Sequence, residues 1–278
     1  MVFGVRMDIL ALKIAYLGTP FHGFQRQPGL RTVEGELIQA LKKSGMIEDT
    51  RTSEFSIAGR TDSGVHALGN VVSFKTSNKL RINHVNSFLS DDIRILASSK
   101  VSNEFNPRFA RQRHYRYLLL PDEELDLELM KKASVRFEGT HNFQKFSKKS
   151  ERNPIRKINQ LRISRKNDYL IIDVYGESFL WNMVRKIVTV LLMIGKSQLN
   201  LLELDKLFDP SFKSSKINIQ PMPAPGLILM GVEYDNLNFE YNEYAKEKFF
   251  NYLSREYLSN YTLVLAEKNM MNVLKYSD

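Results

Sequence analysis

The chain has 278 residues, of which 43% are hydrophobic and 26% charged, so it can bury one large core or two small ones. It has no cysteine, which excludes disulfides, thiolate nucleophiles and cysteine-ligated zinc. Its net charge of +9 favours an anionic partner, with nucleic acid as the first candidate and an anionic membrane surface as the second. No apolar run is long enough to span a membrane and the start does not resemble a signal peptide, so we expect a cytoplasmic protein.

The first half of the chain is expected to form a strand, a helix, two strands, a short helix and a further strand. Alternating apolar residues predict the strands. Apolar residues spaced four apart after Thr32, which has the side chain of a helix N-cap, predict the first helix. The expected ranges in chain order are 10–17, 33–45, 55–57, 70–74, 83–89 and 93–101.

The second half repeats this order of elements. Its expected ranges are 114–120, 124–133, 158–163, 169–175, 179–194 and 226–234, with further helices starting near 139 and over 199–208. Strand, helix, strand, strand, helix, strand is the order of a ferredoxin-like βαββαβ unit. We expect an α+β fold in which two such halves, residues 1–105 and 106–235, form one mostly antiparallel sheet with flanking helices and a central cleft. Residues 236–278 are expected to be a helical C-terminal extension.

The connection inside the first hairpin, residues 58–69, is longer than a hairpin needs. It contains three glycines and carries Arg60, Asp62 and His66 together. An Asx-type turn is the ordinary explanation for such an aspartate. The equivalent hairpin of the second half turns within a few residues, and an elaborated loop on a regular scaffold is where function is usually found.

Arg185 lies in a mostly apolar part of the expected helix over 179–194. A buried guanidinium needs a carboxylate or several other acceptors, although a residue near a helix end can also reach solvent. An ion pair with Asp62 across the cleft would lower the pKa of Asp62 and keep it ionised.

Residues 105–117 mix basic and aromatic side chains, a combination that can hold a nucleic-acid backbone while bases stack on the rings. A basic edge strand is the competing explanation. The five histidines show no metal-ligand spacing, so no metal site is expected.

Residues 59–67, GRTDSGVHA, resemble the catalytic motif of the TruA family of tRNA pseudouridine synthases, and residues 179–185, FLWNMVR, resemble its F-L-x-x-M-V-R motif. Weaker matches lie at 23–27, with Phe24 in place of Trp, and at 105–117, with Pro107 in place of Ala. Two more lie at 139–143 and 226–229. The motifs follow the family's order from about residue 11 to residue 234.

The resemblance implies the pseudouridine synthase fold, with Asp62 as catalytic nucleophile and Tyr115, Arg185 and Leu229 around the target base. The basic residues that it places against RNA are Arg26, Arg60, Arg108 and Arg113. Lys148 and Lys149 belong to a basic loop that is solvated by default but could also bind phosphates. The implied substrate is uridine in the tRNA anticodon stem-loop, at the family-typical tRNA positions 38, 39 and 40, bound by a homodimer. Isomerising uridine to pseudouridine has no redox step and no external group, so no cofactor and no membrane partner are expected.

Several alternatives remain at this point. Asp62 could attack the sugar or the base, or stabilise a separated intermediate. Only one acid is implicated, which argues against a glycosidase with paired carboxylates. The chain could also be a pseudouridine synthase for other tRNA sites or other RNAs, or a catalytically silent RNA-binding protein, with a membrane-surface protein as a distant third.

Overall fold

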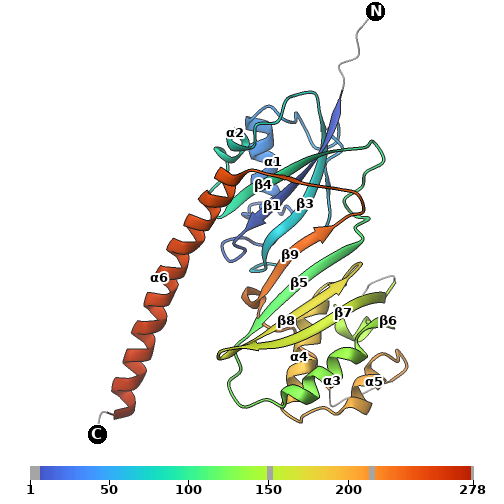
Figure 1. The fold of residues 1–278 in the computed structure, drawn as a ribbon, viewed down its shortest axis with the longest axis vertical. Helices are drawn as coiled ribbons and strands as arrows, with labels where there is room; N and C mark the ends of the chain where they lie inside the picture. The colour runs from blue at the N-terminus through green and yellow to red at the C-terminus, as the bar shows by residue number, and fades with distance from the viewer. Residues whose placement is uncertain (1–6, 149–152, 213–216, 277–278) are drawn as a thin grey trace, which may run out of the picture.

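One sheet of ten described strands runs through the molecule (Figure 1). The structure, a computed structural model, describes residues 7–148, 153–212 and 217–276. The strands are β1 (Asp8–Tyr16), β2 (Ser56–Ile57), β3 (His66–Thr76), β4 (Ile93–Val101), β5 (Gln112–Leu119), β6 (Gly139–Asn142), β7 (Ile155–Lys166), β8 (Tyr169–Gly176), β9 (Leu227–Glu233) and β10 (Glu240–Tyr241). The helices are α1 (Val33–Lys43), α2 (Ile82–Asn86), α3 (Leu127–Arg136), α4 (Met183–Gly195), α5 (Leu201–Leu207) and α6 (Glu243–Tyr276), with short 3₁₀ turns at Gln144–Phe146 and Ala224–Gly226.

Both halves have the same strand order. The sheet runs β10-β4-β1-β3-β9-β5-β8-β7-β6, and β2 pairs with β3 off this path. The first half therefore reads β4-β1-β3-β2 and the second β9-β5-β8-β7, which place the fourth, first, third and second strand of each half side by side. The α+β fold with a mostly antiparallel sheet is confirmed, whereas the division at residues 105 and 235 stays a prediction, because one sheet runs through both halves.

β9 joins the two halves. It pairs parallel with β3, Ile228 opposite His66 and Leu229 opposite Ala67, and antiparallel with β5. β1 occupies one edge of β3, so β2 and β9 share the other edge at different positions along it. The short β2 leaves room on β3 for β9.

The core lies mainly on the helical face of the sheet. Leu12 of β1 and Leu37 of α1 belong to a cluster that continues into α4 of the second half. The opposite face of the first half is covered by the first turns of α6, where Phe249 packs on Ala15 and Leu96. Further along, α6 extends away from the body of the molecule (Figure 1). No helix in the described part of the chain is long and apolar enough to cross a membrane.

Three predictions about elements were wrong in detail. Residues 139–142 form β6 rather than the start of a helix, because they pair with β7 along the sheet edge. α4 begins at Met183 rather than near 179, because Asn182 before it has a left-handed backbone with a φ of 66°. The C-terminal extension begins with strand β10 on β4 before its helix starts.

Candidate active site

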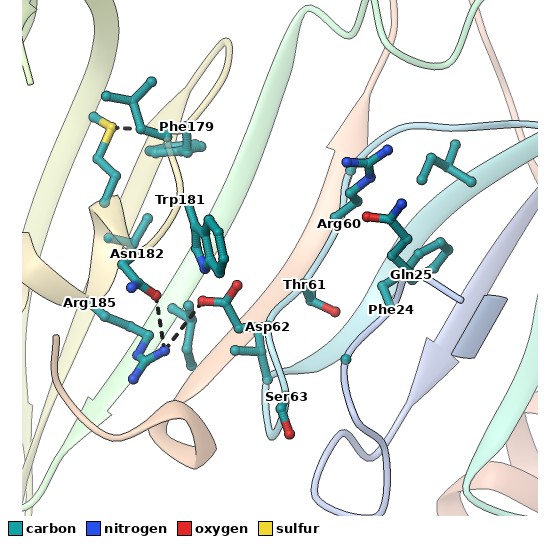
Figure 2. A pocket seen from close by; sticks show the side chains of 18 of the residues that line it. Phe24, Gln25, Arg60, Thr61, Asp62, Ser63, Phe179, Trp181, Asn182 and Arg185 are labelled. Carbon is teal, nitrogen blue, oxygen red and sulfur yellow. Dashed lines mark hydrogen bonds and ion pairs between the residues drawn. The ribbon is translucent and has the colours of Figure 1, made fainter. Parts of the chain in front are cut away.

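A cleft of about 1110 Å³ lies between the two halves, as predicted. The first half lines it with residues 22–27 and 57–63, and the second half with Tyr115, Leu227 and residues 179–185. Figure 2 shows Asp62 pointing toward Trp181 and Arg185, which come from the second half. Residues of both halves are therefore required to complete the cleft.

The predicted ion pair between Asp62 and Arg185 is present. Nη1 of Arg185 lies 3.3 Å from Oδ2 of Asp62 and also donates to Oδ1 of Asn182 at 3.2 Å. Nε of Arg185 donates to the carbonyl oxygen of Met222 at 2.5 Å. Arg185 is the third residue of α4, where the helix dipole disfavours a cation. The three acceptors offset this and hold the guanidinium facing Asp62.

The pKa of Asp62 is raised above its ordinary value, which contradicts our expectation. Burial raises the pKa, and this effect outweighs the nearby Arg185 charge, hydrogen bonding from Arg185 and the Trp181 side chain, and the more distant Lys148, all of which lower it. Desolvation of a carboxylate makes it a stronger base and nucleophile than the same group in water.

The start of the loop that carries Asp62 is fixed by a buried hydrogen-bond chain from β1 and β3. Nδ2 of Asn70 donates to the Gly59 carbonyl oxygen at 3.0 Å and to the Tyr16 hydroxyl at 3.3 Å. The Tyr16 hydroxyl lies 2.8 Å from Oγ1 of Thr61. Because this hydroxyl already accepts from Asn70, its own proton is available for Thr61. Asp62 thus follows a residue that the core holds in place.

The end of the loop is tied by His66 to both halves. The Gly18 backbone N–H donates to Nδ1 of His66 at 2.9 Å, so the ring proton sits on Nε2, which lies 3.1 Å from the Pro225 carbonyl oxygen. Burial lowers the pKa of His66 and keeps the ring neutral. A side chain at Gly18 would put its Cβ 2.0 Å from the Val65 carbonyl oxygen, so only glycine fits against the loop.

Of the two predicted residues Tyr115 and Leu229, only Tyr115 lines the cleft. Tyr115 lines the cleft, is 8% exposed, and meets the Phe179 ring edge-on with centroids 5.2 Å apart. Burial raises the pKa of Tyr115 to about 12, so its phenol is neutral. Leu229 is fully buried between Ala67 and Tyr115 in the sheet, and it is Leu227 that lines the cleft.

Three of the predicted RNA-contacting arginines, Arg26, Arg60 and Arg108, are exposed and line the cleft. Arg26 forms an exposed ion pair with Glu34 at 3.6 Å. Lys148 stands over the Trp181 ring at 4.2 Å from its centroid. Lys149 lies outside the described residues.

Arg113 departs from this pattern, because its side chain is directed into the protein. It is 7% exposed, and its guanidinium donates to carbonyl oxygens of Ala58, Arg108 and Glu177.

Sequence reasoning gave no role to Trp181 and Asn182. They fill the two variable positions of the F-L-x-x-M-V-R motif, and a motif carries no information at such positions. The signal for Arg113 was available: it alternates with Tyr115 and Tyr117 along β5, so it shares their buried face.

The geometry combines a partly buried carboxylate, a guanidinium that pairs with it, a neutral phenol and a basic rim. No group of three histidine, aspartate or glutamate residues in the described ranges could hold a metal ion. The arrangement suits attack by a single carboxylate on a substrate that carries phosphates.

A family model described as tRNA pseudouridine synthase matches residues 133–235, which include Arg185 but not Asp62. Two proteins named tRNA pseudouridine synthase A, from Methanothermobacter thermautotrophicus and Methanosphaera stadtmanae, are each 45% identical to this chain. Both comparisons cover 97% of this chain, and they cover 97% of the first relative and 100% of the second. Among solved structures, a Cbf5-Nop10-Gar1 complex has 12% identity and a TM-score of 0.35, covering 66% of this chain and 45% of that chain, which is too low to compare the folds. The sequence relationship confirms the resemblance of the motifs, and the chain belongs to the TruA family of tRNA pseudouridine synthases.

Proposed function

We propose that the protein isomerises uridine to pseudouridine in the anticodon stem-loop of tRNA, with Asp62 as nucleophile. One observation carries this proposal: the partly buried carboxylate of Asp62 is paired with Arg185 in a cleft whose rim carries exposed arginines. Family membership supports the reaction and the choice of tRNA.

The reaction breaks the C–N glycosidic bond, turns the uracil and forms a C–C bond through C5, while the C5 proton passes to a base. Asp62 attacks either C1′ of the ribose or the uracil ring, and burial strengthens it for both. Arg185 opposes the effect of burial on the pKa of Asp62 and so favours the ionised carboxylate that attacks. The neutral Tyr115 ring is placed to pack against the uracil, with Phe179 behind it.

The substrate uridine has to leave its stack before it can reach Asp62, because the carboxylate lies inside the cleft. Arg26, Arg60 and Arg108 are available on the rim to hold phosphates while the nucleotide turns. Arg60 makes no hydrogen bond or ion pair with any described residue, which suits a phosphate-binding role.

Release of tritium from tRNA labelled at uridine C5 tests the proposal. Wild-type protein should release tritium to water, and Asp62→Ala should release none while binding tRNA with nearly unchanged affinity. Asp168→Ala, in the corresponding hairpin turn of the second half, is the matched control and should keep wild-type activity. No release by the wild type from several tRNAs would refute the enzyme; release from other RNAs alone would refute the substrate; and an active Asp62→Ala would refute the nucleophile.

We also propose a homodimer, as the family resemblance implies. Support comes from α6, in which every described residue from Tyr257 to Lys275 is exposed, including Leu258, Tyr261 and Leu265. A lone helix with this much apolar surface is expected to be covered. Light scattering should give twice the mass of the chain, and replacing Leu258 and Leu265 by Lys should give the monomer; a monomeric wild type would contradict the proposal.

A further inference from the structure

The guanidinium of Arg113 lies beneath the cleft and contacts three segments of chain. Its Nη2 donates to the carbonyl oxygens of Ala58 at 2.8 Å and of Arg108 at 3.0 Å, and its Nη1 donates to that of Glu177. Its Nε would lie 3.9 Å from a Cβ placed on Gly59. The side chain is therefore enclosed by main chain.

Each of these carbonyl groups anchors a segment that lines the cleft. Ala58 is hydrogen-bonded through its N–H to Val71 and starts the loop that carries Asp62 four residues later. Glu177 follows β8 and precedes the turn that carries Trp181 four residues later. Arg108 lies in the connection from β4 to β5 and itself lines the cleft.

The burial of Arg113 is hard to reconcile with RNA binding. Only 7% of the residue is exposed, and no described carboxylate is within ion-pair distance, so main-chain dipoles alone hold its charge. A guanidinium has a planar fork that can serve several carbonyl groups in fixed directions, which a single ammonium cannot do.

We propose that Arg113 is a positioning residue that sets the distance between the Asp62 loop of the first half and the Trp181 turn of the second. The expected effect on the reaction rate rests on the proposed function, whereas the expected effect on the position of the Trp181 turn does not. Removing the fork should let the two walls of the cleft shift relative to each other, and displacements near 1 Å in an active site cost about 100-fold in rate.

The test is Arg113→Lys, which keeps the charge and loses the fork. Trp181 is the only tryptophan, so acrylamide quenching of its fluorescence without RNA reports the turn directly. Arg111→Lys is the matched control: Arg111 lies one residue before β5, is 60% exposed, and makes only surface ion pairs with Glu233 and Asp235. In Arg113→Lys we expect altered quenching, kcat lowered about 10- to 100-fold, and a tRNA Kd and its salt dependence within about twofold of wild type.

Unchanged quenching in Arg113→Lys overturns the proposal, whatever happens to tRNA affinity. If circular dichroism shows that the variant does not fold, the wild-type protein provides the test through the NMR resonances of the Arg113 guanidinium N–H groups. Resonances that do not shift when tRNA is added support a buried positioning residue. Resonances that shift overturn the proposal. The quenching comparison uses no RNA, so it is interpretable even if tritium release shows that the protein is not a synthase.

Discussion

The two central hairpins of the molecule occupy the same place in their halves and differ in what connects their strands. β7 and β8 have 12 and 8 residues, and pair up to Lys166 and Tyr169, leaving Asn167 and Asp168 as the turn. In the first half β2 has two residues, and the connection to β3 spans 58–65. The first hairpin therefore has a shorter paired region than the second, and a longer connection that carries Asp62.

The first connection is held from outside its own hairpin. β1 supplies Tyr16, the following loop supplies Gly18, and the second half supplies Arg185 and the carbonyl oxygen of Pro225. The second connection needs no such partners, because its ladder continues to the turn. The difference teaches that the loop carrying Asp62 depends on contacts from both halves, and each contact can be removed separately.

The largest effect is expected for Arg185→Gln, which removes the contact from the second half. Loss of one electrostatic partner at a reacting group costs about 100- to 1000-fold in kcat. Because the Arg185 charge lowers the pKa of Asp62, its removal lets that pKa rise further. The acid limb of the kcat–pH profile should therefore move to higher pH, which single-turnover rates across a pH series would measure; an unmoved limb contradicts the pairing.

The second largest effect is expected for Gly18→Ala, in which the added methyl group would clash with the loop that carries Asp62. Its Cβ would lie 2.0 Å from the Val65 carbonyl oxygen, so the backbone has to shift. Overpacking of this kind costs about 1–3 kcal/mol in the free energy of unfolding. Gly231→Ala is the control, because nothing lies within 4 Å of its added Cβ. Urea unfolding of both variants checks this, and equal losses would show that the contact at Gly18 is unimportant.

A smaller effect concerns pH and His66. The folded state lowers the pKa of His66 below its ordinary 6.5, so below that pH the unfolded chain takes up a proton that the folded chain does not. His66 therefore makes the protein lose stability as the pH falls through 6.5 toward the folded-state pKa. His66→Gln should flatten the dependence of Tm on pH in this window, and a slope as steep as in the wild type would contradict the assignment.

The smallest effect is expected when two asparagines with a left-handed backbone conformation are each replaced by glycine. Asn167 has a φ of 54° in the turn of the second hairpin, and Asn182 has a φ of 66° beside Arg185. Glycine fits both conformations, so Asn→Gly at either site should change stability by less than about 1 kcal/mol. Only Asn182→Gly also removes an acceptor of Arg185 and should lower kcat, by up to about 10-fold. Parallel kinetics on the two variants test this contrast.

The parts of the fold with purely local causes were predictable from the sequence. β4 was predicted at its observed bounds, and Thr32 caps α1 as predicted, because its side chain accepts from the Gly35 N–H. β6 was missed because it exists through pairing with β7, which residues 139–142 do not reveal. Whether the pKa of Asp62 rises or falls depends on how far residues distant in sequence bury it. The motifs therefore identified Arg185 as the partner of Asp62, but they could not show that the pKa is raised.

The position of β9 has a consequence for how the protein is made. Its pairing with β3 is the one strand pairing between the halves among the described residues, and it becomes possible only after residue 227 has been synthesised. Until then the edge of β3 at His66 has no β9 partner, and Leu227 is missing from the cleft that holds Asp62. β1 and α1 of the first half are made earlier, but Asp62 then lacks the second-half residues that line its cleft in the complete chain. A chain that ends before residue 227 would therefore carry Asp62 without the complete cleft around it.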